Sequence, residues 1–247
     1  MFEKMLSVVI PAYNEGEHIY NNLKIMEDAL KGSFKEFELI PVNDGSKDNT
    51  MEEIERAAND MEHVVAAGYE KNRGKGGAIR EGVSKAKGKY IAFLDADLDL
   101  APEHLIDFME KMLETNATAV IGSKLHKDSK VDYPLPRRIM SVGYYIMLKV
   151  MFKLDIKDTQ TGVKLFKAKR LKKVMDYATH TSFAYDIEIL ALINQFGGKI
   201  VEMPVELVFQ RQTGWGRIKI SDILEVANDT MSIHREVRKI RKIGYMF

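Results

Sequence analysis

The chain has 247 residues and a formal net charge of +1, with 45% hydrophobic and 30% charged residues. That length is enough for one large domain with a full core, and the composition is ordinary for a soluble globular enzyme. The absence of cysteine excludes disulfides and thiolate metal sites and fits a reducing compartment. The N-terminus lacks the charged-then-apolar layout of a secretory signal.

The small net charge hides an asymmetry between the two halves. Residues 1–123 carry 14 basic and 23 acidic side chains, whereas residues 124–247 carry 23 basic and 13 acidic ones. The basic half is suited to an anionic acceptor or an anionic membrane surface, and ordinary solvated charge is the alternative. Nucleic acid is disfavoured as a partner, because neither a recognition motif nor an aromatic stacking pattern is present.

The first half alternates between two patterns. Short apolar runs predict strands over residues 6–10, 37–42, 64–67, 90–94 and 117–121. The segments between them predict helices over residues 17–31, 76–87 and 102–114. A further helix is predicted to begin after Asp48, which would be its N-cap. Strands that alternate with helices in this way indicate an α/β fold, with a mostly parallel sheet covered by helices on both faces.

The second half is less regular. It predicts helices over residues 137–152, 184–196 and 221–242, and a strand pair over 199–210 interrupted by Pro204. Residues 139–152 include 11 apolar residues of 14, too few to span a bilayer, which favours a core helix. We expect one domain over residues 1–220 and a basic helical extension over 221–247. That extension either lies on an anionic membrane or is a solvated terminal helix.

The sequence Asp95-Ala96-Asp97-Leu98-Asp99 directly follows the predicted strand that ends at Leu94. The crevice at the carboxyl ends of the strands is where open α/β sheets bind ligands. Carboxylates without cysteine or histidine nearby suit Mg²⁺ or Mn²⁺ rather than zinc, and Mg²⁺ usually also binds substrate phosphates. The residues therefore predict a metal-diphosphate site. The alternative is an acidic, solvated loop that starts the next helix.

Three further loops are predicted at the same edge of the sheet. Residues 11–15, Pro-Ala-Tyr-Asn-Glu, follow the first strand, and residues 43–46, Asn-Asp-Gly-Ser, follow the second. Tyr13 could pack on a base or ribose, and Asp44 could accept hydrogen bonds from a nucleoside. Residues 72–77, Asn-Arg-Gly-Lys-Gly-Gly, open a helix, where backbone N–H groups favour anions. Each loop alone could be a simple turn.

Together, in this order, these motifs resemble the family 2 glycosyltransferases, which have the GT-A (Rossmann-like) fold. Within that family the chain resembles the polyprenyl-phosphate sugar synthases, such as dolichol-phosphate mannose synthases and dolichyl-phosphate β-glucosyltransferases. The resemblance covers about residues 5–220. In the second half it rests on segments 122–124, 136–138, 158–166, 185–188 and 211–217.

The resemblance implies an inverting transfer of a hexose from UDP-glucose or GDP-mannose to a polyprenyl phosphate, with Mg²⁺ or Mn²⁺. It implies that the metal is held by Asp95, Asp97 and Asp99. It implies donor binding by Pro11, Ala12, Tyr13, Glu15, Asp44, Asn72, Lys75, Gly76, Asp95, Arg211 and Arg217. The acceptor phosphate would be positioned by Lys124, Arg137 and Arg138. We expect a cytoplasmic protein, attached peripherally at the inner membrane face.

The acceptor decides whether the reaction needs a general base. A phosphate monoester is largely dianionic at neutral pH and can attack without losing a proton. A saccharide hydroxyl would instead need a base, for which Asp186 and Glu188 are the candidates. Asp186 could equally be a carboxylate at a helix N-terminus. A catalytically idle nucleotide-sugar sensor is a further alternative, against which the intact carboxylates argue.

Overall fold

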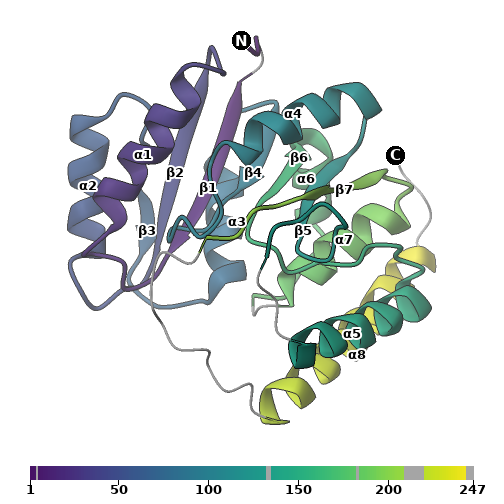
Figure 1. Cartoon of the computed structure of the whole chain (residues 1–247). Coiled ribbons are helices and arrows are strands. Elements are labelled where there is room, and N and C mark those ends of the chain that lie inside the picture. The colour runs from purple at the N-terminus through teal and green to yellow at the C-terminus, as the bar shows by residue number, and fades with distance from the viewer. Residues whose placement is uncertain (4, 132–134, 182–183, 209–219, 243–247) are drawn as a thin grey trace.

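The computed structural model describes residues 1–3, 5–131, 135–181, 184–208 and 220–242, with side chains throughout except at 135–142, 220–228 and 241–242. A twisted sheet of seven strands runs through the middle of these residues (Figure 1). Its strands are β1 (Leu6–Ala12), β2 (Phe37–Asp44), β3 (Ala67–Tyr69), β4 (Tyr90–Phe93), β5 (Ala119–Ser123), β6 (Lys164–Lys167) and β7 (Ile200–Pro204). Their order in the sheet is β3-β2-β1-β4-β6-β5-β7.

Only β6 runs against its neighbours within this sheet. It pairs antiparallel with β4 and β5, whereas all the other pairs are parallel. The parallel strands therefore end at one edge, and the segment that precedes β6 reaches the same edge. The expected α/β class with a mostly parallel sheet is confirmed.

Helices cover both faces of the sheet, because successive side chains of a buried parallel strand point to opposite sides. Val8 and Ile10 of β1 pack in a core with α1 (Ile19–Lys31), α2 (Thr50–Asp60) and α4 (His104–Thr115). Val9 of β1 packs in a second core with α3 (Lys75–Lys85), α6 (Ala168–Met175) and α7 (Tyr185–Gln195).

The last layer is a pair of helices, α5 (Leu135–Phe152) and α8 (Ile220–Lys242), which lie side by side (Figure 1). The hydroxyl groups of Tyr144 and Thr230 are 3.3 Å apart across this pair. Ile233 and Val237 of α8 are buried in the same core as α7. In the described part of the chain, every helix is too short or too polar to cross a bilayer.

Several elements differ from the expected secondary structure. The strand pair over 199–210 is the single strand β7, which ends at Pro204, a residue that cannot donate to a ladder. The third strand is β3, at Ala67–Tyr69, and Val64 makes only an isolated bridge to Leu39. The strand β6 and the helix α6 were not expected. Helix α5 begins at Leu135, two residues before its expected start at residue 137, and Arg137 and Arg138 lie in its first turn.

Candidate active site

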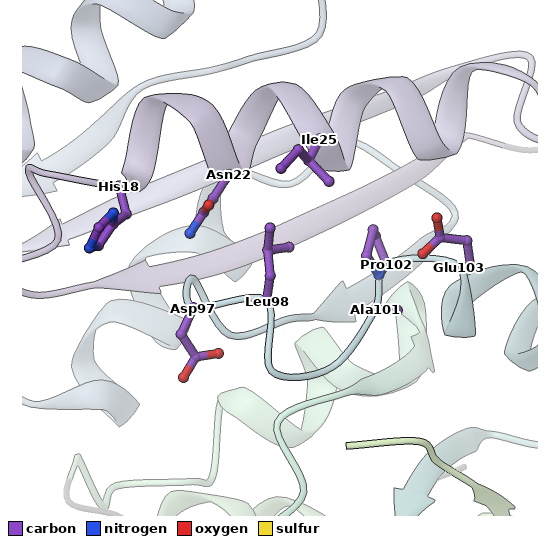
Figure 2. A pocket seen from close by; sticks show the side chains of 8 residues that line it. All are labelled: His18, Asn22, Ile25, Asp97, Leu98, Ala101, Pro102 and Glu103. Atoms are coloured by element: carbon purple, nitrogen blue, oxygen red, sulfur yellow. The ribbon is translucent and has the colours of Figure 1, made fainter. Parts of the chain in front are cut away.

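The carboxyl ends of β1, β2 and β4 bring three of the predicted loops to one edge of the sheet. Leu98, in the loop after β4, has a left-handed φ of 60°, and Asn14, after β1, has a φ of 55°. Such backbone is uncommon outside glycine and concentrates at functional sites. In Figure 2 the side chain of Leu98 points toward α1, whereas the carboxylate of Asp97 points away from it. The turn therefore separates an apolar anchor from an acidic group.

Asp95 and Lys75 form the central ion pair of this edge. The ammonium of Lys75, from the start of α3, is 2.5 Å from Oδ1 of Asp95. Burial alone would lower the pKa of Lys75, but the nearby carboxylates of Asp95 and Asp186 raise it overall. The ammonium therefore stays charged at neutral pH. This cation and Asp95 are 20 residues apart in the chain.

The surroundings of Asp97 disfavour the charged form of its carboxyl group. Its pKa is raised to about 6, first because the carboxyl is desolvated and second because Asp95 is close by. A divalent cation between two such carboxylates would favour their charged forms, so the donor chemistry fits Mg²⁺ or Mn²⁺. Asp99 donates its backbone N–H to Oδ1 of Asp97 at 3.1 Å. Among the described residues, however, Asp95, Asp97 and Asp99 do not form a compact three-ligand cluster.

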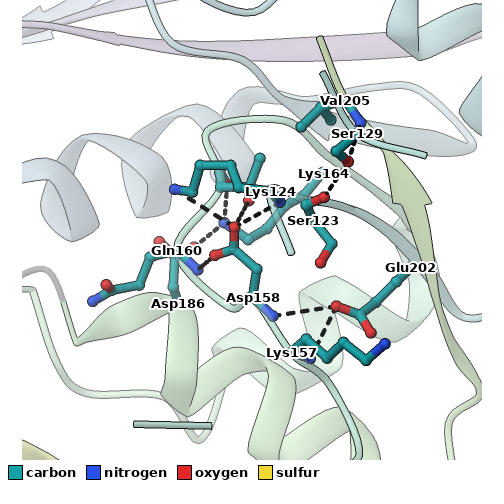
Figure 3. A network of polar contacts seen from close by, with 11 residues as sticks. Ser123, Lys124, Ser129, Lys157, Asp158, Gln160, Lys164, Asp186, Glu202 and Val205 are labelled. Carbon is teal, nitrogen blue, oxygen red and sulfur yellow. Dashed lines mark hydrogen bonds and ion pairs between the residues drawn. The ribbon is translucent and has the colours of Figure 1, made fainter. Parts of the chain in front are cut away.

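The turn before β6 packs directly on Asp95. A Cβ added to Gly162 would collide with the carboxylate of Asp95, so any larger residue there would displace that carboxylate. Asp158 fixes the start of this turn by accepting hydrogen bonds from the hydroxyl of Thr161 at 2.7 Å and the backbone N–H of Lys124 at 2.9 Å (Figure 3). The ammonium of Lys124 also lies 3.5 Å from Asp158. Because β6 is antiparallel to its neighbours, the turn that precedes it lies at the site as a fourth segment.

Asp44, at the end of β2, is buried and accepts hydrogen bonds from three protein donors. Its Oδ1 accepts hydrogen bonds from the hydroxyl of Tyr69 at 2.6 Å and the backbone N–H of Arg73 at 2.8 Å. The side-chain amide of Asn72 donates to its Oδ2 at 3.1 Å. In this structure Asp44 and Asn72 therefore order the loop that leads to Lys75. Their contact with a nucleoside stays a prediction.

The loop after β1 is tied to the start of α2. Glu15 donates its backbone N–H to the hydroxyl of Thr50, and Gly16 donates to Asp48. Asp48, the predicted N-cap, also accepts the backbone N–H of Thr50 at 3.1 Å, although Asn49 occupies the cap position itself. Pro11 and Ala12 are the last residues of β1. Tyr13 beyond them is 44% exposed, as a stacking surface requires.

The start of α3 is held by a backbone contact. The N–H of Gly76 donates to the carbonyl of Thr181 at 2.9 Å, and that carbonyl would collide with a Cβ at Gly76. The N–H of Gly76 thus has a protein partner in this structure. An interaction between Gly76 and a phosphate stays a prediction.

Asp186 and Glu188 are both buried in the first turn of α7 and both have partners. The ammonium of Lys164 is 2.7 Å from Asp186. Burial raises the pKa of Asp186, and Lys164 and Lys75 counteract that rise. Glu188 accepts the backbone N–H groups of Thr179 and His180 at 3.0 and 2.9 Å. The prediction that one of them serves as a base is untested, and their contacts anchor α7.

A cavity of about 350 Å³ lies beside Asp97, between α1 and the loop that leads to α4 (Figure 2). It is lined by His18, Asn22, Ile25, Asp97, Leu98, Ala101, Pro102 and Glu103. The side-chain amide of Asn22 donates to the carbonyl of Ala96 at 2.8 Å, which ties α1 to the acidic loop. Helix α1 thereby supports the acidic loop.

The structure does not describe the side chains of several predicted site residues. Arg211 and Arg217 lie outside the described residues, and the side chains of Arg137 and Arg138 are not described. Three residues that build the site were not predicted: Gly162, Tyr69 and Lys164. Gly162 and Lys164 belong to a segment quoted for the resemblance, so that segment was a usable signal. Nothing in the sequence marks Tyr69.

The chain is similar to several known proteins. The model of the family "Glycosyl transferase family 2" matches residues 7–175. A dolichyl-phosphate beta-glucosyltransferase of Trichomonas vaginalis is 33% identical over 242 residues, covering 92% of this chain and 72% of the relative. The dolichyl-phosphate beta-glucosyltransferase of Saccharomyces cerevisiae is also 33% identical, covering 82% of this chain. The chain spans 66% of that yeast relative.

Solved structures confirm the GT-A fold. Glucosyl-3-phosphoglycerate synthase of Mycobacterium tuberculosis, crystallised with UDP, superposes with a TM-score of 0.68 at 18% identity, covering 94% of this chain and 80% of that one. The same enzyme with Mn²⁺, UDP and glucosyl-3-phosphoglycerate gives a TM-score of 0.66. At this identity the likeness concerns the fold alone.

Proposed function

This chain belongs to glycosyl transferase family 2 and is a glycosyltransferase, and on that premise we propose that it transfers glucose from UDP-glucose to a dolichyl-type polyprenyl phosphate, with inversion at the anomeric carbon. The names of the relatives from Trichomonas and yeast favour glucose and dolichyl phosphate. UDP is bound in a mycobacterial structure of the same fold, and we propose a uridine nucleotide here by analogy with it.

One observation carries the proposal most directly: the Lys75–Asp95 pair lies beside Asp97 at the carboxyl edge of the sheet. A nucleoside diphosphate sugar needs cations where its leaving diphosphate gains charge. Lys75 provides one such cation. We propose that Arg211 and Arg217 provide further cations for the diphosphate. We propose that Tyr13 packs on the base or ribose. The nucleoside itself would be held by the segments that end at Ala12, Glu15, Asp44 and Asn72.

We propose a divalent metal ion bound by Asp95 and Asp97, with Asp99 as a further ligand. Mn²⁺ accompanies UDP in a mycobacterial structure of the same fold. Bound there, the ion would act as a Lewis acid on the donor diphosphate. The raised pKa of Asp97 supports a cation at this position, since two carboxylates are held near each other there.

The acceptor in this proposal is a phosphate, which needs no general base. The partners of Asp186 and Glu188 support that choice, since one carboxylate is paired with Lys164 and the other accepts backbone N–H groups. We propose that Lys124, Arg137 and Arg138 position the acceptor phosphate. Lys124 already lies beside Asp158, on the turn that packs against Asp95.

We also propose that the outer face of the α5–α8 pair meets an anionic membrane, where a lipid acceptor resides. Ile146 and Val150 of α5 and Met231 of α8 are large exposed apolar side chains. Four basic residues are exposed nearby: Lys153, Arg235, Arg238 and Lys239. A cavity of about 450 Å³ between α5, α7 and α8 is lined in part by Val150, His234 and Arg238. Apolar and basic groups together favour an interfacial position. That the membrane side is cytoplasmic stays a prediction from sequence.

The test is sugar transfer to dolichyl phosphate from labelled UDP-glucose and, separately, GDP-mannose, with Mn²⁺, with Mg²⁺ and with chelator. We expect a glucosylated lipid phosphate from UDP-glucose that chelator abolishes. Dolichol without phosphate is the matched acceptor control and should give no product. Product from GDP-mannose alone would overturn the proposal that glucose is the transferred sugar. Transfer to dolichol or a saccharide, together with loss of that activity in Asp186→Asn, would overturn the phosphate acceptor.

A further inference from the structure

Lys164 is a lysine buried inside the sheet. It is the first residue of β6, between Phe93 of β4 and Ile121 of β5 in the ladder, and its side chain is 2% exposed. Removing an ammonium from water costs several kcal/mol unless other groups compensate for it. A buried lysine at the end of a strand that faces a candidate active site therefore needs an explanation.

The ammonium of Lys164 contacts two segments of the site at once. It is 2.7 Å from Oδ1 of Asp186 in the first turn of α7, and it donates to the carbonyl of Thr161 at 2.5 Å. The carbonyl belongs to the turn before β6, and Figure 3 shows Lys164, Asp186 and Asp158 in this same network. One buried cation thus joins a helix, a strand and a turn.

Both contacts lead to the Lys75–Asp95 pair. On one side, Thr161 precedes Gly162, whose Cα packs so closely on the carboxylate of Asp95 that a Cβ would collide with it. On the other side, the carboxylate of Asp186 acts on Lys75, which pairs with Asp95. Charges of alternating sign therefore run from the core to the edge, in the order Lys164, Asp186, Lys75, Asp95.

We propose that Lys164 is a positioning residue of the donor site, which sets the places of Asp95 and Lys75 through Thr161 and Asp186. Without it, the carboxylate of Asp186 is left without its nearest cation and competes with Asp95 for Lys75. The turn that carries Gly162 also loses the bond that holds it on Asp95. The proposal rests on the donor site argued above, and Lys164 itself touches no substrate.

A purely structural ion pair is the competing explanation, and a double variant separates the two. Replacing a buried ion pair by apolar residues of similar size is often neutral for stability, whereas removing one partner is costly. Lys164→Met/Asp186→Leu should therefore fold with a melting temperature near that of the wild type, and Lys164→Met alone should be less stable. Lys172→Met is the matched control, since the ammonium of this lysine of α6 donates to the carbonyl of Ala86 rather than to a residue of the site.

Three readouts test the double variant. We expect kcat for glucosyl transfer to fall by about 100-fold, the size of effect that a misplacement of about 1 Å produces. We expect the affinity for UDP in Mn²⁺, measured by calorimetry, to fall by about 10-fold. A crystal structure of the variant should have the Lys75–Asp95 contact broken or lengthened. The control should match the wild type in all three measurements.

The outcomes separate this proposal from its alternatives. A double variant with wild-type kcat and UDP affinity would overturn it and leave a structural pair. Loss of kcat with unchanged UDP affinity and an intact Lys75–Asp95 contact would also overturn it, and would favour Asp186 as a base. A wild type that transfers no glucose to lipid refutes the proposed function alone. In that case the crystal structure still decides whether Lys164 positions the pair.

Discussion

Charged groups are arranged in opposite ways at the carboxyl edge of the sheet and on the outer face of the α5–α8 pair. At the sheet edge, Asp44, Lys75 and Asp95 each have protein partners at short distances. On the helix pair, Arg235, Arg238 and Lys239 have no acidic partner among the described residues. Paired charges fix a geometry, whereas solvated charges attract a surface without defining one. We infer that the first region suits the donor and the second suits a membrane.

The strongest test of the sheet edge is Asp95→Asn. The change removes one charge from the proposed metal site and the partner of Lys75. We expect transfer to fall by at least about 100-fold, comparable to the loss of a main electrostatic contact in other enzymes. Initial rates over a Mn²⁺ titration measure it. Asp107→Asn, at an exposed position of α4, should stay within about twofold of the wild type. A rate for Asp95→Asn in that same range would remove Asp95 from the site.

Gly162→Ala tests whether packing alone controls the same edge. The new methyl group would displace the carboxylate of Asp95 without changing any charge. We expect transfer to fall by about 10- to 100-fold, with a stability cost of about 1–3 kcal/mol from overpacking. Activity assays and urea unfolding measure the two effects. Gly32→Ala is the control, because a Cβ there meets nothing within 4 Å. Equal activities of the two variants would contradict the close packing.

Charge reversal on α8 tests the other side of the comparison. Each basic residue near an anionic surface contributes about 1 kcal/mol, so Arg238→Glu/Lys239→Glu should weaken binding to anionic vesicles by at least about 10-fold. Co-sedimentation with phosphatidylglycerol and with phosphatidylcholine vesicles, at low and high salt, measures it. The double reversal Lys24→Glu/Lys169→Glu, on α1 and α6, is the matched control. If both double variants bind alike, the α5–α8 face is not the membrane contact.

Tyr69→Phe should give the smallest effect. It removes one of the hydrogen bonds to Asp44 and leaves those from Asn72 and Arg73. We expect a loss of about 1 kcal/mol of stability and an increase of KM for UDP-glucose by a few-fold, with kcat little changed. Thermal unfolding and steady-state kinetics provide the numbers. A large fall in kcat at constant KM would instead place Tyr69 near the reacting groups.

The sequence predicted well those elements in which local pattern and burial agree. The apolar run before Asp95 marks β4, and its position between two helices implies the parallel arrangement. The strand β6 was not predicted, because the charged Lys164 at its start breaks the apolar pattern expected of a buried strand. The packing of Gly162 on Asp95 joins residues far apart in the chain, which no local pattern encodes. The roles of Arg211 and Arg217 stay predictions, since they lie outside the described residues.

The hydrogen bond from the backbone of Lys124 to the side chain of Asp158 has a topological consequence. The chain leaves the sheet after β5, forms α5, and returns to β6 at nearly the point from which it left. Segments whose ends lie together can be exchanged without disturbing the strands that flank them. Residues 125–157 therefore form a closed excursion from the sheet, and a replacement for them must keep the buried apolar side chains of Leu148, Leu154 and Ile156. A graft of the corresponding segment from a relative should retain the sheet and the Lys75–Asp95 pair, and it offers a route to change the acceptor while the donor side stays fixed.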